Sequence, residues 1–350
     1  MVISLAHGAG GAESAALMRD VFAKHFTGTT LARLEDAAVV PGGEQLAVST
    51  DTFVVTPLVF PGGDIGKLAA VGTINDVLMS GATPLYLTCG FVLDAGLEIS
   101  LLDTICGSLA ATATEAGVEI IAGDTKVVET RAAEPGLLIN TTGIGVCASP
   151  GVADTSFSSQ QFKPKEVSAT PGEPLGPPPW RVILSGTLGD HHAAILSARM
   201  GITNSIESDC ALLTPLIRAL NEANVPVHAM RDVTRGGLAT ILNELAAASG
   251  VSIQLEEASI PVAPEVRAFC GLLGLDPLYM GNEGKAVFAV AEKDTPRALA
   301  ALRSTPLGAS AAIIGHGTAS SPLPPVSIKT NIGGTIRLDP LYGEGLPRIC

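Results

Sequence analysis

The N-terminal half of the chain alternates between the periods of a helix and of a strand. Apolar residues at Leu17, Val21 and Phe22 fall on one side of a predicted helix over 13–26. The stretch Pro61-Gly-Gly-Asp64 resembles a helix start, and Gly81 ends the helix that follows it. The other predicted elements are strands at 45–56, 84–93, 118–122 and 137–147 and a helix at 98–116. Such alternation is typical of an α/β domain.

A second alternation begins at residue 181, without a clear internal repeat of the first. Its predicted helices are 190–200, 210–223, 235–249, 262–273 and 294–304, and its strands lie near 181–185, 252–256, 286–291 and 311–315. The segment between the two halves is dominated by Ser, Pro, Gln and Thr and is typical of a linker or exposed loop. We therefore predict a mixed α/β protein made of a domain over 1–149, a linker over 150–179, a domain over 180–335 and a tail over 336–350.

The composition excludes several classes of protein. Hydrophobic residues make up 47% of the 350 residues and aromatic residues only 4%, so the cores must be built from Ala, Val, Leu and Ile. A formal charge of −13 argues against nonspecific nucleic-acid binding, which needs a positive field. No signal peptide or membrane-spanning segment is evident. The six cysteines are scattered and form no CxxC pair, which favours a cytoplasmic protein with reduced thiols.

The chain ends in Pro347-Arg-Ile-Cys350. Prolines at 340 and 347 enclose glycines at 343 and 345, so the segment is neither a good helix nor a good central strand. It is typical of a mobile arm that carries a thiol. Taken alone, however, the segment is better explained as a frayed terminus with an incidental cysteine.

Four aspartates lie at positions that suggest a specific role for a carboxylate. Asp76 falls inside an apolar helix and Asp51 inside a strand of apolar and β-branched residues, while Asp36 and Asp124 lie near turns. Oxygen ligands from separate elements suit Mg²⁺ bound to nucleotide phosphates. Each aspartate taken singly is also explained as a cap or an ion-pair partner, but the set favours a metal site.

Two glycine-rich turns offer backbone N–H groups to a phosphate. One contains Gly62 and Gly63 and is followed by Lys67; the other contains Gly10 and Gly11. Neither has the spacing of a P-loop or of a dinucleotide-binding fold. An ordinary turn explains both equally well.

In the second half, two carboxylates lie beside predicted elements. Asp232 precedes an amphipathic helix; Asp232 or Thr234 would cap this helix, and a role of Asp232 as a ligand is an equal alternative. Glu283 precedes the strand at 286–290, where a loop can aim a side chain, although a surface turn is an equal explanation. His191 and His192, at a helix start, are interpreted as structural or solvated residues.

Taken in order, these stretches resemble the HypE family of hydrogenase maturation factors, within the AIR-synthase-like (PurM-like) superfamily. The matching pieces are His7-Gly-Ala-Gly-Gly, Ser49-Thr-Asp-Thr, Phe60-Pro-Gly-Gly-Asp-Ile-Gly-Lys-Leu, Gly72-Thr-Ile-Asn-Asp-Val, Gly123-Asp-Thr-Lys-Val-Val, Leu184-Ser-Gly-Thr-Leu-Gly-Asp-His, Asp232-Val-Thr-Arg-Gly-Gly, Asn282-Glu-Gly-Lys and the terminal Pro-Arg-Ile-Cys. The terminal cysteine is what distinguishes the family within the superfamily. The departures are Ala9 in place of Ser, Gly281 in place of Ala, and a longer proline-rich linker.

The resemblance implies a two-domain PurM-like fold whose N-terminal domains pair in a homodimer and bind ATP. It implies that a HypF-type carbamoyltransferase loads a carbamoyl group onto the C-terminal cysteine. ATP then drives dehydration of this S-carboxamide to a thiocyanate, and the cyano group passes to iron on a HypC–HypD scaffold for [NiFe]-hydrogenase. The rival interpretations are a superfamily kinase or synthetase acting on thiamine phosphate, selenide or a purine precursor, and a non-catalytic nucleotide-binding adaptor.

Carried onto this sequence, the resemblance assigns roles to the candidate residues. Cys350 would carry the substrate, Glu283 would be the base, and Lys126 would polarise the reacting group. The ATP phosphates would contact Lys67, Gly62, Gly63, Gly10, Gly11 and Asp232, and Mg²⁺ would be held by Asp36, Asp51, Asp76 and Asp124.

Overall fold

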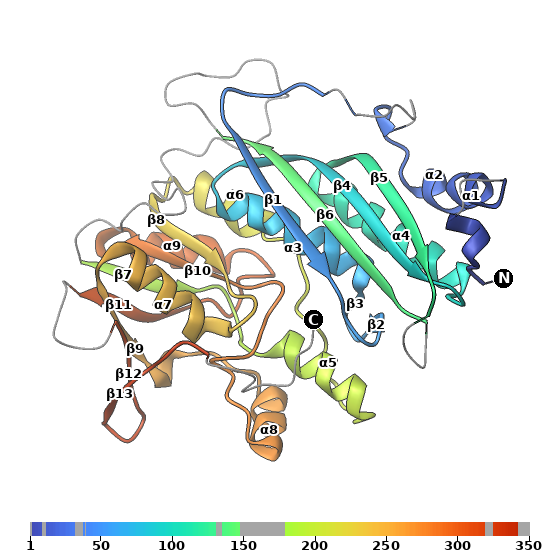
Figure 1. Cartoon of the computed structure of the whole chain (residues 1–350). Helices are drawn as coiled ribbons and strands as arrows, with labels where there is room; N and C mark the ends of the chain where they lie inside the picture. Colours follow the sequence, from blue (N-terminus) through green and yellow to red (C-terminus); the bar gives the residue numbers. More distant parts are fainter. Residues whose placement is uncertain are drawn as a thin grey trace. The chain divides into compact units, whose positions relative to one another are not determined.

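The computed structural model describes residues 2–8, 12–31, 38, 40–130, 135–147, 179–318 and 325–341 (Figure 1). These residues form two compact units, one made of most of the chain up to 147 and one beginning at 179. The predicted site residues Gly10, Gly11, Asp36 and Cys350 lie outside the described residues, as does nearly all of the predicted linker. Within the described ranges, no helix is long and apolar enough to cross a membrane.

The first unit begins with a helical segment and continues as a sheet with helices. The predicted helix over 13–26 is confirmed as α1 (Ala12–Leu17), a π-helical turn (Met18–Phe22) and α2 (Ala23–His25), after a 3-10 turn at Leu5–Gly8. The strands are β1 (Leu46–Phe53), β2 (Val59–Phe60), β3 (Gly63–Asp64), β4 (Thr83–Asp94), β5 (Glu119–Val128) and β6 (Leu137–Val146), and the long helices are α3 (Ile65–Met79) and α4 (Ile99–Ala116).

The main sheet of this unit has the strand order β1-β6-β4-β5. β4 and β5 run parallel and are joined by α4, while the other neighbouring pairs are antiparallel. Alternate residues of β4, from Leu87 to Leu93, are buried, so one face of the sheet lies against the helices. The opposite face presents the exposed apolar side chains Leu46, Val48 and Leu138.

Glycine at position 66 lets the two long helices of this unit approach closely. A Cβ atom on Gly66 would overlap the carbonyl oxygen of Ile105 in α4. Backbone atoms cannot swing aside as a flexible side chain can, so only a residue without a side chain fits. The start of α3 is therefore fixed by packing as well as by its cap.

The described strands of the second unit form a seven-stranded sheet with the order β13-β12-β9-β11-β7-β10-β8, and among them only β12 and β9 pair in parallel. Its strands are β7 (Trp180–Leu184), β8 (Val227–Asp232), β9 (Ser252–Glu256), β10 (Ala286–Ala291), β11 (Ala312–Thr318), β12 (Val326–Lys329) and β13 (Thr335–Arg337). Its helices are α5 (Asp190–Met200), α6 (Thr214–Glu222), α7 (Gly237–Ser249), α8 (Pro264–Leu273) and α9 (Thr295–Arg303), with 3-10 turns at Glu257–Ser259 and Glu292–Asp294. All five predicted helices are confirmed.

The core of the second unit lies between this sheet and α7. Leu238, Ile241 and Leu242 of α7 pack on Trp180 and Val182 of β7, together with buried residues of β9, β10 and β12. On the other face, α9 contacts β10 and α6 contacts α9. Figure 1 shows α7 and α9 on opposite sides of the strands. The two units thus each possess a mixed sheet, as predicted for the fold class.

We expect Gly66→Ala to destabilise the first unit by about 1–3 kcal/mol, the range for inserting atoms into a well-packed interior. The added methyl group would collide with the Ile105 carbonyl and push α3 from α4. The free energy of unfolding, measured by denaturant titration, checks this.

The matched control is Gly271→Ala in α8, where nothing lies within 4 Å of the added Cβ atom. Alanine favours a helix over glycine by about 1 kcal/mol, so the control should be neutral or stabilising. Equal destabilisation by both substitutions would contradict the packing argument.

Candidate active site

The glycine-rich turn before α3 is a short hairpin that leads into a helix cap. Phe60 pairs with Gly63, which leaves Pro61 and Gly62 at the corner, and Gly62 has a φ of 93°. Proline followed by a residue with positive φ is the signature of a type II turn. The Asp64 carboxylate then accepts hydrogen bonds from the backbone N–H groups of Gly66 (2.7 Å) and Lys67 (3.0 Å).

This arrangement bears on the predicted phosphate contacts. The N–H groups of Gly66 and Lys67 already donate to a carboxylate, whose negative charge disfavours an anion at this helix start. The Lys67 ammonium group donates to the carbonyl oxygen of Gly62 at 3.0 Å. Phosphate binding by Gly62, Gly63 and Lys67 stays a prediction, in which Lys67 would have to exchange this contact for a phosphate.

Two of the predicted metal ligands come from neighbouring elements on the helix-covered face. The Ser49 hydroxyl in β1 donates to Asp76 Oδ2 in α3 at 2.7 Å. Asp51 lies two residues further along β1 and therefore on the same face as Ser49. The same seam contains Thr73 and Thr141, whose buried hydroxyls are 2.6 Å apart. Thr73 and Asp76 of α3 thus face polar residues of the sheet, which explains how an aspartate is tolerated in an apolar helix.

Within one copy of the chain, Asp124 does not join Asp51 and Asp76. β1 and β5 are opposite edges of the sheet, three strand spacings or about 14 Å apart. In addition, Asp124 pairs with Gly90, and these residues face away from the buried side of β4. Asp51, Asp76 and Asp124 are therefore not brought together by a single chain, and Asp36 lies outside the described residues. The part of Asp124 in metal binding stays a prediction.

Lys126 lies on the same open face of β5 as Asp124. Its ammonium group is 3.0 Å from Asp124 Oδ2, and both side chains are mostly exposed. This contact lowers the pKa of the Asp124 carboxyl group from its usual value. The ion pair lies at a position open to solvent.

In the second unit, hydrogen bonds fix the loop that precedes β10. The Asn282 side chain accepts a hydrogen bond from the N–H of Gly189 (2.8 Å) and donates to the carbonyl oxygens of Val233 and Met280 (3.1 Å each). The N–H of Val233 in turn donates to the carbonyl of Lys285 at 2.9 Å. Asn282 is 1% exposed, so these contacts are shielded from water.

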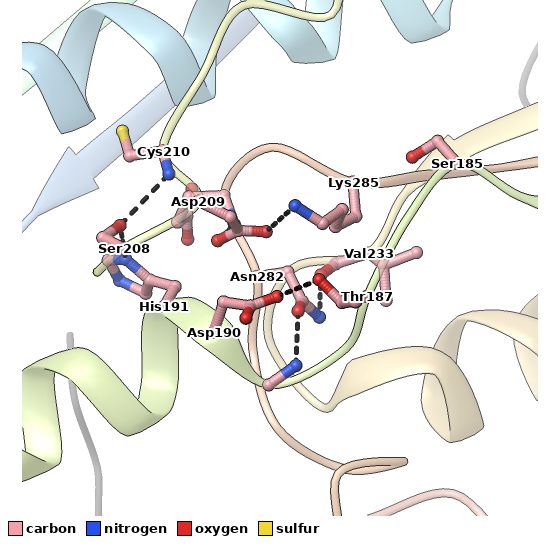
Figure 2. A network of polar contacts seen from close by, with 12 residues as sticks. Ser185, Thr187, Asp190, His191, Ser208, Asp209, Cys210, Val233, Asn282 and Lys285 are labelled. Carbon is pink, nitrogen blue, oxygen red and sulfur yellow. Dashed lines mark hydrogen bonds and ion pairs between the residues drawn. The ribbon is translucent and has the colours of Figure 1, made fainter. Parts of the chain in front are cut away.

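Glu283 and Lys285, the remaining polar residues of this loop, contact Asp209. Figure 2 shows Asp209 beside Lys285. Asp209 Oδ1 accepts the N–H of Glu283 at 3.0 Å, and Asp209 Oδ2 lies 3.2 Å from Lys285 Nζ. The carbonyl of Glu283 accepts the N–H of Ala211 at 3.2 Å. Glu283 itself is only 9% exposed. The backbone of the candidate base is thus bonded on both sides.

Beside this loop, the start of α5 is a second group of buried polar residues. The Thr187 hydroxyl donates to Asp190 Oδ2 at 2.6 Å, and His191 Nδ1 lies 2.7 Å from the Ser208 hydroxyl. Burial raises the pKa of Asp190, and the neighbouring Asp209 charge adds to this effect. His191 and His192 are both buried, so the structural interpretation of these histidines holds rather than the solvated one.

Asp232 ends β8, paired with Ala286 of β10. It does not cap α7, because the residue before that helix is Gly236, which provides no side-chain cap and has a φ of 79°. The alternative of Asp232 as a helix cap is therefore wrong, and its role as a ligand stays a prediction.

Asp209 is the residue of this region that the sequence interpretation missed. It lies outside the helices and strands, before α6, where no periodicity singles it out. Its contacts with the backbone of Glu283 and the side chain of Lys285 reveal it only once the fold is known. In the part of the chain that the structure describes, no group of three or more His, Cys, Asp or Glu residues is arranged to hold a metal ion.

Comparison with known proteins places the chain in one family. The sequence profiles of AIR synthase related proteins match it twice, the N-terminal domain over residues 34–147 and the C-terminal domain over 181–323. The carbamoyl dehydratase HypE of Rhodobacter capsulatus is 43% identical over 353 aligned positions, which cover 99% of this chain and 98% of that protein.

Solved structures agree in fold over the same length. The hydrogenase maturation protein HypE in complex with ATP is 40% identical, with a TM-score of 0.88 over 99% of this chain and 100% of that one. The structure of a HypE–HypF complex matches with 38% identity and a TM-score of 0.72, over 93% of this chain and 100% of that one. The predicted two-domain fold of the AIR-synthase-like type is confirmed.

The two buried histidines predict how stability depends on pH. Burial lowers the pKa of His191 and of His192 to about 4, from an ordinary value of 6.5. Asp209 opposes the shift at His191, whereas His191 and Arg199 add to it at His192. Between about pH 6.5 and pH 4, these two histidines are therefore protonated in the unfolded chain and remain neutral in the folded chain.

We expect the free energy of unfolding to fall as the pH drops from about 6.5 to 4, by at most about 3 kcal/mol for each histidine. Denaturant titrations across this range measure it. His192→Gln should flatten the decline, because glutamine does not titrate, whereas His7→Gln in the other unit should leave the decline in place. A stability that is constant or rises toward pH 4 would contradict the account.

Proposed function

The chain belongs to the HypE family of carbamoyl dehydratases, among the AIR synthase related proteins, and we propose that it converts an S-carboxamide on Cys350 into a thiocyanate with the use of ATP. The observation that carries the proposal is the 43% identity to a carbamoyl dehydratase across 99% of the chain. As a carbamoyl dehydratase of hydrogenase maturation, the enzyme acts on a carbamoyl group. The proposed steps from carboxamide to thiocyanate follow from what the removal of water requires.

The oxygen of a carboxamide is a poor leaving group and must be activated before it can depart. In the proposed reaction the carboxamide oxygen bonds to the γ-phosphorus of ATP, and ADP leaves. Loss of two protons from nitrogen and cleavage of the carbon–oxygen bond then give the nitrile and inorganic phosphate. The carboxamide oxygen ends in the phosphate, so one water equivalent is removed for each ATP consumed.

Glu283 is the proposed base for the nitrogen protons. The backbone N–H and C=O of Glu283 are both hydrogen-bonded, so these contacts fix the position of the backbone that carries its side chain. A base acts efficiently only when it is held within hydrogen-bond reach of the proton it removes. Lys126, a solvent-facing ammonium group paired with Asp124, is proposed to polarise the reacting group.

The first unit supplies the residues proposed to hold Mg²⁺ and ATP. Mg²⁺ in such sites binds one or two carboxylates together with phosphate oxygens, and the neighbouring Asp51 and Asp76 fit that requirement. When bound, the ion would offset the charge of the transferred phosphate. Asp36 and Asp124 are proposed as further ligands, and Gly10, Gly11, Gly62, Gly63, Lys67 and Asp232 as contacts of ATP.

Three partners are proposed. A HypE–HypF complex has been crystallised, and the carbamoyl group on Cys350 would come from a HypF-type carbamoyltransferase. A second copy of the chain would cover the open face of the first sheet, where Leu46, Val48 and Leu138 are exposed. The cyano group would pass to a HypC–HypD iron scaffold, in the cytoplasm.

The reaction predicts that phosphate release depends on Cys350. Protein loaded with carbamoyl groups and given Mg-ATP in a single turnover should release one phosphate for each group loaded, and Cys350→Ala should release none. The quantity to measure is the phosphate burst. ATP turnover that survives Cys350→Ala would instead favour a kinase that acts on a free small molecule, and ATP binding without hydrolysis would favour an adaptor.

Removing the proposed base should slow the chemical step. General base catalysis contributes about 10²–10⁴-fold, so we expect Glu283→Gln to reduce the dehydration rate by about 100-fold or more. The matched control is Glu265→Gln, an exposed carboxylate in the first turn of α8. Both rates are measured in single turnovers with ATP in excess. A Glu283→Gln enzyme as fast as the control would remove Glu283 from this role.

A further inference from the structure

A carboxylate from a separate segment of the chain anchors the loop that carries Glu283. Asp209 lies seventy-four positions earlier in the sequence, and its side chain is only 4% exposed. Its two oxygens have different partners, the N–H of Glu283 and the ammonium group of Lys285. One buried side chain therefore binds the loop at two points.

The contact continues through the backbone on both sides. The N–H of Ala211 donates to the carbonyl of Glu283 at 3.2 Å. A Cβ atom on Gly284 would overlap the carbonyl oxygen of Asp209, so the two segments lie against each other with no room for a side chain between them. The aliphatic part of the Lys285 side chain packs on Gly186, where an added Cβ atom would lie 3.0 Å from Lys285 Cε.

We propose that Asp209 is a positioning residue for the dehydration: through Oδ1 it fixes the Glu283 backbone so that the Glu283 carboxylate is presented to its substrate. The inference rests on the proposed role of Glu283 as the base. Asp209 touches no reacting atom and acts only through the loop.

The physical case depends on what happens without the acceptor. With Asp209 removed, the buried N–H of Glu283 loses its partner and the loop must shift to find another. A displacement of about 1 Å at a catalytic group can cost about 10²-fold in rate. A buried ion pair between Asp209 and Lys285 that merely stabilises the fold is the competing explanation, and it assigns no importance to Oδ1.

Two double variants separate these explanations. Asp209→Asn with Lys285→Met keeps an acceptor oxygen for the Glu283 N–H and removes both charges. Asp209→Leu with Lys285→Met removes the same charges and the acceptor as well. Both lack the ion pair, and asparagine and leucine both branch at Cγ into two heavy atoms, so the main difference between the variants is whether an acceptor faces the Glu283 N–H.

We expect the Asn/Met enzyme to dehydrate the loaded carboxamide within about threefold of the wild-type rate, and the Leu/Met enzyme to be slower by about 30-fold or more. The KM for ATP should be the same in both, because none of the proposed ATP contacts lies in this loop. The midpoint of the pH–rate profile should stay in place in the Asn/Met enzyme, since the charge of Asp209 is not what matters. Equal rates in the two variants, or a displaced midpoint in the Asn/Met enzyme, would overturn the proposal.

Hydrogen exchange of the Glu283 amide provides a second readout that needs no turnover. The amide should be protected in the wild type and in the Asn/Met protein, and a fast-exchanging amide in either would overturn the proposal even if the Leu/Met protein failed to fold. Failure of the proposed function is distinct from this, because it would leave wild-type protein unable to dehydrate its carboxamide while the amide stayed protected.

Discussion

A buried carboxylate must be paired, and in the second unit this requirement shapes the loop around Glu283. Asp209 accepts the backbone N–H of Glu283 through Oδ1, and its charge is offset by an ion pair between Oδ2 and the ammonium group of Lys285, both residues belonging to the loop before β10. Asn282 connects the same loop to the start of α5 and to Val233. Any movement of the loop would expose several unpartnered polar groups together, so it is held rigidly, as the placement of a catalytic base requires.

Much of the fold could be predicted from the sequence because local rules decide it. The start of α3 follows from Asp64, whose carboxylate caps the helix as the Pro-Gly-Gly-Asp pattern indicates. The end of α4 follows from Gly117, which has a φ of 72° and closes the helix in the left-handed conformation. Periodicity located helices such as α6 and α8 because each buries one face, whereas α5 buries every residue from His191 to Ser197. Short or polar strands were missed: β2 and β3 have two residues each, and β8 contains His228, Arg231 and Asp232.

The site was harder to predict because it depends on which elements become neighbours. Asp51, Asp76 and Asp124 all stood out as carboxylates, yet the strand order separates Asp124 from the other two by the width of the sheet. Strand order is a long-range property that no local pattern encodes. Asp209 illustrates the same limit, because its importance comes from Glu283 and Lys285, which are distant in sequence. A resemblance between whole chains, in contrast, integrates such long-range information, and it indicated the family.

The most direct test of the account is the intact mass of the C-terminal peptide. The protein would first be incubated with an active HypF-type carbamoyltransferase and carbamoyl phosphate, and then with Mg-ATP. We predict a carbamoyl adduct on Cys350 that loses one water when hydrolysable ATP is added and keeps it with a non-hydrolysable analogue. An adduct whose mass does not change with ATP, or a Cys350 that is never modified by a carbamoyltransferase shown to be active, would contradict the proposed function.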